Sequence, residues 1–179
     1  FSRSSNNAAM GGCGVFMNSG ICSLVHSTVA QNSASGAGGG IRNGAGFVLA
    51  AGNVIAGNTG GSDDEVSGAN FASLSPSFVG EDDSVGQVFL AGGSLTFAST
   101  GTTIDDVLDT NLQSNGGPSL SHALVAGSPA IDAGINAIAT DAAITADQRA
   151  FKRILDGDDD GTATVDIGAV EAAMVAPAA

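Results

Sequence analysis

Short runs of alternating hydrophobic and polar residues, separated by glycine, serine and asparagine, fill the first third of the chain. Alternation of this kind predicts β-strands, because successive side chains of a strand point to opposite faces. By this pattern Cys22 and Leu24 share one face of a strand, and Val48 and Ala50 share one face of a later strand. We therefore expect an all-β fold in which each strand turns one row of small apolar side chains inward.

A repeat with a period of 26 residues organises these strands and is clearest in residues 1–60. Residues 12–15 align with 38–41, and residues 29–32 align with 55–58 without a gap. The period is too short for a propeller blade and has no helical spacing, which favours one coil of a β-solenoid per repeat. Coils of this kind stack about 4.8 Å apart, the ordinary spacing of paired strands. The predicted fold is a right-handed parallel β-helix.

One polar column runs through the repeat, since Asn6, Asn32 and Asn58 are each 26 positions apart. An asparagine at the same place in successive coils can donate to the amide of the next coil and accept from the previous one. We therefore predict a structural asparagine ladder along the stack.

Composition narrows the classes of partner. The chain carries 18 Asp and Glu against 5 Lys and Arg, a net charge of −13. Three of the five basic residues fall within 149–153, so no basic face spans the chain, and neither nucleic acid nor an anionic membrane surface is an expected partner. No apolar run is long enough for a membrane span.

Cys13 and Cys22 are the only cysteines and both fall at inward positions. They are too few for a structural zinc site. A disulfide across the coil in an oxidising compartment and two buried thiols are both compatible with these positions.

The densest group of carboxylates lies in residues 156–166. It resembles the calcium loop of EF-hands, which has oxygen ligands at positions 1, 3 and 5, glycine at 6 and a backbone carbonyl at 7. The bidentate Glu of position 12 is missing, because Ile167 stands there. A calcium site and a solvated acidic turn both remain open. The candidate ligands are Asp156, Asp158, Asp160, Thr162 and Asp166.

Several motifs are similar to those of a known family. Residues 27–44 resemble coils of bacterial parallel β-helix repeat proteins with a pectate-lyase-like fold. Further along, NGGP (115–118), HAL (122–124), GSPAIDAG (127–134), DQR (147–149), DGDDDG (156–161) and VDIGAVE (165–171) resemble signatures of the choice-of-anchor Q family of surface proteins. The resemblance implies secretion and attachment to the cell surface.

We expect residues 1–110 to form the coils and residues 111–179 to form an irregular C-terminal region that caps the solenoid, because open coil ends expose strand edges. The first coil starts partway through the repeat. We expect either that further coils precede it or that uncapped coils associate with a second copy or with other surface or matrix components.

The expected role is structural or adhesive, outside the cell or at its surface. Residues 1–60 contain no Asp or Glu, whereas a glycosidase needs two carboxylates facing one cleft and a lyase needs acidic calcium ligands. We therefore expect no catalytic residues. The alternative is a polysaccharide lyase or hydrolase, or the non-catalytic remnant of one.

Overall fold

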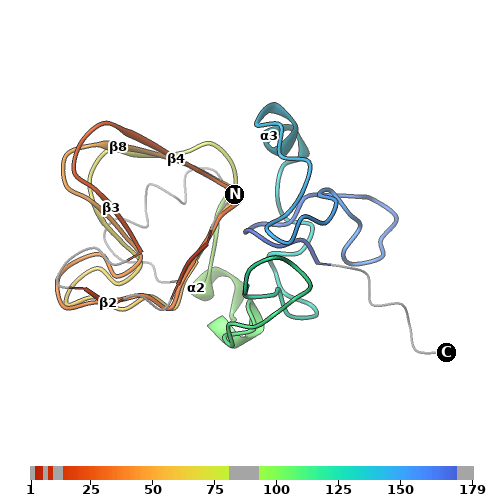
Figure 1. Cartoon of the computed structure of the whole chain (residues 1–179), viewed down its shortest axis with the longest axis horizontal. Helices are drawn as coiled ribbons and strands as arrows, with labels where there is room; N and C mark the ends of the chain where they lie inside the picture. The colour runs from red at the N-terminus through yellow and green to blue at the C-terminus, as the bar shows by residue number, and fades with distance from the viewer. Residues whose placement is uncertain (1–2, 6–7, 10–13, 81–92, 173–179) are drawn as a thin grey trace.

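A computed structural model describes residues 3–5, 8–9, 14–80 and 93–172 (Figure 1). Short β-strands dominate, and the described helices are brief: α2 (Phe97–Thr100), the 3₁₀ turn η1 (Ile104–Asp106) and α3 (Asn136–Asp141). The strands are β1 (Arg3–Ser5), β2 (Ala8–Ala9), β3 (Val15–Met17), β4 (Ile21–Val25), β5 (Thr28–Ala30), β6 (Ser33–Ala34), β7 (Ile41–Asn43), β8 (Phe47–Ala51), β9 (Val54–Ala56), β10 (Val66–Gly68), β11 (Phe71–Ser73), β12 (Phe78–Val79) and β13 (Leu95–Thr96).

All named strands pair in parallel, in four sheets ordered β1-β5-β9-β12-β13, β10-β7-β3, β11-β8-β4 and β2-β6. Val15 pairs with Ile41, and Ile41 pairs with Val66, so each strand pairs with its counterpart one repeat later in the sequence. In Figure 1 the strands of successive repeats lie over one another around a single closed outline. The chain is therefore β-rich and built on parallel sheets, as the alternation predicted.

Inward side chains of three sheets form the first hydrophobic cluster. It contains Leu24, Val29, Ile41, Val48, Ala50, Ile55, Val66, Phe71 and Val79, with Val15, Met17 and Cys22 packed against it. Several contacts between repeats leave no room for a side chain. A Cβ on Gly39 would lie 2.3 Å from the carbonyl oxygen of Thr59 in the next repeat. Glycine at this position lets the two backbones approach.

The C-terminal region lies beside the stack of repeats (Figure 1), whereas we had expected from the sequence that it would cover the end of the stack. Strands β5 and β9 are buried at every residue, so their sheet is covered on both faces. Its outward side chains, among them Ala30, Val54 and Phe78, form a second cluster with Val107, Leu108, Ala130 and Ile167. Two backbone N–H groups fasten this cover: Gly168 donates to the Gly52 carbonyl and Ala169 donates to Thr28 Oγ1. The C-terminal region lies at this side because burying the apolar outward residues of β5, β9 and β12 stabilises the fold, as covering an open end would.

Candidate functional site

The polar column of the repeat brings Asn32 and Asn58 together inside the stack. The backbone N–H and Nδ2 of Asn32 donate to Asn58 Oδ1 at 3.0 and 2.8 Å, and Asn58 Nδ2 donates to the Val29 carbonyl at 2.9 Å. Asn6, the first residue of the predicted ladder, lies outside the described residues.

Glu65 continues this column in place of a further asparagine. It is fully buried, and its carboxylate accepts hydrogen bonds from the Gly57 N–H at 2.7 Å and from the N–H and Nδ2 of Asn58. This role was not predicted from the sequence, because Asp63, Asp64 and Glu65 form one acidic run in which no residue stands out. The position of Glu65 directly before a strand was the available signal.

A second polar ladder was also not predicted from the sequence. The Ser27 N–H donates to Asn53 Oδ1 at 2.9 Å, the Asn53 N–H donates to Ser77 Oγ, and the Ser77 N–H donates to Ser94 Oγ. Ser27 and Asn53 are one 26-residue period apart, so the repeat contained the signal. Together the two ladders satisfy backbone groups at the corners of the stack.

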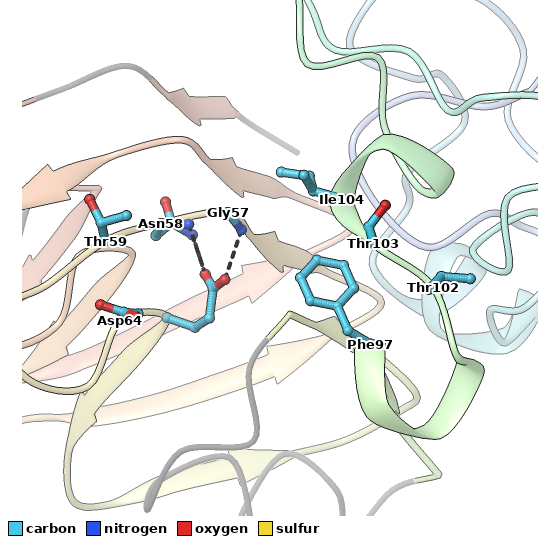
Figure 2. Close-up of a pocket in the computed structure, with 9 residues that line it drawn as sticks. Gly57, Asn58, Thr59, Asp64, Phe97, Thr102, Thr103 and Ile104 are labelled. Atoms are coloured by element: carbon cyan, nitrogen blue, oxygen red, sulfur yellow. Dashed lines mark hydrogen bonds between the residues drawn. The ribbon is translucent and has the colours of Figure 1, made fainter.

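A cavity of about 470 Å³ opens between Asn58 and Phe97 (Figure 2), and Glu65 is among its lining residues. The ring of Phe97 stands on one side of it and packs on Phe78, with 5.4 Å between ring centroids. Two carboxylates line the cavity and none of its lining residues is cationic, so an anionic ligand such as an acidic sugar is repelled there. The lining residues are Gly57, Asn58, Thr59, Asp64, Glu65, Phe97, Thr102, Thr103 and Ile104.

The carboxylates of the acidic loop turn largely onto their own backbone. Asp156 accepts hydrogen bonds from the N–H groups of Asp159 and Gly161, and Asp160 accepts one from Thr162. The loop is thus a turn held by hydrogen bonds between its own carboxylates and its own backbone N–H groups.

Asp132 joins the acidic loop from outside it. Carboxylate oxygens of Asp132, Asp156 and Asp158 lie within 4.8 Å of one another, and Asp132 Oδ2 accepts hydrogen bonds from the N–H groups of Gly157 and Asp158. The structure thus groups two of the five predicted ligands, Asp156 and Asp158, with a residue that the sequence analysis did not select. No spacing rule links Asp132 to this loop, since the contact is made by folding.

Asp166, a further predicted ligand, is buried and does not belong to this group of three carboxylates. Its carboxylate accepts hydrogen bonds from the N–H groups of Asp132, at 2.8 Å, and Ala172. Burial raises the pKa of Asp166 to about 7, and the nearby charge of Glu171 acts in the same direction. Asp166 therefore fastens the C-terminal region together.

Arg153 connects this fastening to the stack. It is buried, and Nη2 donates to the carbonyl oxygens of Asp166 and Gly168 at 3.0 and 2.6 Å, while Nε lies 3.6 Å from Glu171 Oε2. The same Nη2 lies 3.1 Å from Nδ1 of His26, which is fully buried at the end of β4. Burial, with the charge of Arg153, lowers the pKa of His26 to about 4.

Arg149 and Cys22 lie outside the contacts described above. Within the basic cluster 149–153, Arg149 forms an ion pair with Asp147, with 2.7 Å between Nη2 and Oδ2. Cys22 is a free, partly buried thiol whose pKa is raised by burial. Of the two alternatives that the sequence left open, the structure has a thiol at Cys22, and Cys13 lies outside the described residues.

Within residues 3–5, 8–9, 14–80 and 93–172, no helix has the length and apolar character needed to cross a membrane. No protein-family model matches the chain, and no curated protein or solved structure matches it either. The geometry above and the motifs of the sequence are therefore the basis for a functional proposal.

Proposed function

We propose that this chain is part of a right-handed parallel β-helix with a structural or adhesive role on the outside of a bacterial cell. One observation carries the proposal: counterpart strands of successive repeats pair in parallel around a common interior, as in β3, β7 and β10. Stacks of this kind present long, rigid side surfaces. The resemblance of residues 115–171 to choice-of-anchor Q proteins supports the location at the cell surface.

The distribution of charge supports a non-catalytic role. The side chain of Glu65, beside the cavity, is held by backbone and amide N–H groups in the interior, which suits a structural role better than that of a general acid or base. The alternative, a polysaccharide lyase or hydrolase or its remnant, requires turnover of a glycan, and assays on neutral and acidic glycans test it directly.

The proposed partner is the chain itself, through strand edges. Among the described strands β3 and β4 are outer strands of their sheets, and an outer strand can pair with a further strand. Electron microscopy of the natively isolated protein tests the structural role. We expect filaments or sheets; compact single particles at every concentration would contradict it.

Calcium binding is a second proposal, and the acidic group fits it in one respect. Asp132 Oδ1 is shielded from solvent and accepts no hydrogen bond of standard geometry, so a carboxylate oxygen is left available beside Asp156 and Asp158. Carboxylate oxygens are the ligands that calcium prefers. Calorimetric titration with calcium is expected to give saturable heat that Asp132→Asn abolishes, and a titration without heat would remove the proposal.

A further inference from the structure

The sheet β11-β8-β4 has an apolar outer face. Register pairs Ile21 with Phe47 and Ser23 with Leu49 across the first two strands. Because Leu24 and Val48 point inward, alternation turns these pairs outward. We call the outward positions the β4 face; they are Ile21, Ser23, Val25, Phe47, Leu49, Ala51, Ala72 and Leu74.

Large side chains on the β4 face remain in water. Ile21 is 75% exposed, Leu74 is 56% exposed and Phe47 is 40% exposed. Among these eight described positions Ser23 is the only polar residue and none is charged, although the chain carries a net charge of −13. A contiguous apolar surface of this kind marks an interaction site more often than it occurs by chance.

The neighbouring sheet shows what such a face does in this fold. Apart from Thr28, the outward residues of β5, β9 and β12 are also apolar, and they are buried under residues 104–170 of the same chain. That buried interface reaches the end of the β4 face, because Gly52, which follows Ala51, accepts a hydrogen bond from the Gly168 N–H. The β4 face is therefore a direct continuation of a buried interface.

We propose that the β4 face binds the same face of a second copy of this chain, with the two sheets packed about a two-fold axis. The inference rests on the proposed structural role and gives it a surface distinct from the strand edges. An uncharged face of a strongly acidic chain is where two copies meet with the least repulsion, whereas an anionic membrane would be repelled by the rest of the molecule. Two sheets pack face to face about 10 Å apart, which requires no rearrangement of either stack.

The size of the face sets the strength of the association. Three short strands offer far less than the ~800 Å² per partner of a standard stable interface. We therefore expect a reversible dimer with a dissociation constant of about 10 µM or weaker. Salt should strengthen it, because screening reduces the repulsion between two copies while the apolar contact is unaffected.

Sedimentation equilibrium of the full chain between about 5 and 500 µM tests this inference. After any filaments have been removed by centrifugation, the wild type is expected to pass from monomer to dimer. Ser23→Glu, which puts a carboxylate at an exposed point of the face, should weaken dimerisation at least tenfold. Ser114→Glu makes the same change at an exposed serine of the C-terminal region and should leave it unchanged. Ile21→Ser, which removes an exposed apolar group without adding charge, should also weaken it.

A monomer at all concentrations, or a dimer that Ser23→Glu and Ile21→Ser leave intact, would overturn the inference. Circular dichroism of each variant checks that the fold is retained. Electron microscopy separates this result from the proposed structural role. Filaments that persist in Ser23→Glu would keep that role and place association at the strand edges, whereas dimers without filaments would support the β4 face alone.

Discussion

Replacing Asn58 with alanine tests the contribution of the buried ladder to stability. The side chain makes four hydrogen bonds in the interior: two accepted from Asn32, one donated to the Val29 carbonyl and one donated to the carboxylate of Glu65. A buried neutral hydrogen bond contributes about 1 kcal/mol, and one to a charged group contributes more. We expect Asn58→Ala to lower the free energy of unfolding by about 4 kcal/mol, a large part of the stability of an ordinary domain.

Urea unfolding followed by circular dichroism measures this loss, and hydrogen exchange locates it. The Asn32 amide, which donates to Asn58 Oδ1, should exchange much faster in the variant. Asn111→Ala is the matched control, because Asn111 is exposed and bonds only the neighbouring Asp109 in the described structure; it should cost less than about 0.5 kcal/mol. A loss below about 1 kcal/mol for Asn58→Ala would refute the reasoning.

Three further predictions follow from the geometry. Gly39→Ala should cost about 2–3 kcal/mol in urea unfolding, because its Cβ would meet the Thr59 backbone, whereas Gly20→Ala, at a φ of +85° in open space, should cost about 1 kcal/mol; equal losses would contradict the close approach of the repeats. The His26 pKa falls from 6.5 to about 4 on folding, so its contribution is present above pH 6.5 and is lost as the pH falls towards 4. His26→Gln lacks this titrating group, so its free energy of unfolding relative to wild type should rise by up to about 3 kcal/mol as the pH falls over that range. Asp166 titrates in the variant and in the wild type alike, so its effect cancels in the difference, and a difference independent of pH would contradict the reasoning. Arg153→Met leaves Glu171 buried without its cation and should cost about 3 kcal/mol or more at pH 7, and a variant as stable as wild type would show that the pair contributes nothing.

The sequence contained the parallel pairing and its register, because both follow from local regularities. The pairing of Val15 with Ile41 matches the 26-residue period, and the inward rows of Leu24 and Val48 follow from alternation. The contact between Asn32 and Asn58 follows from the same period. Regularities of this kind persist through a repeat, so one correct alignment places many residues.

The remaining features depend on contacts between segments without a common period. Asp132 meets Asp156 and Asp158 only because the irregular C-terminal region folds back on itself. The acidic pattern of residues 156–166 resembled a metal loop, yet burial directs Asp166 towards the N–H groups of Asp132 and Ala172. Predicting the lateral position of the C-terminal region also required knowing which of two apolar surfaces, the side of the stack or its open end, the region would bury. The sequence shows that Val54 and Phe78 are apolar, but it does not show that burying them would be favoured over burying the open end of the stack.

The lateral cover has a consequence for how the molecule comes apart. In a stack held only by contacts between neighbouring repeats, each repeat can fray separately from an end. Here the segment 104–170 shares one hydrophobic cluster with Ala30, Val54 and Phe78, which belong to three successive repeats. Loss of any one of these repeats also weakens the anchorage of the segment on the other two. The covered repeats therefore unfold as one cooperative unit, and a pulling force or a protease meets a single large barrier there in place of a series of small ones.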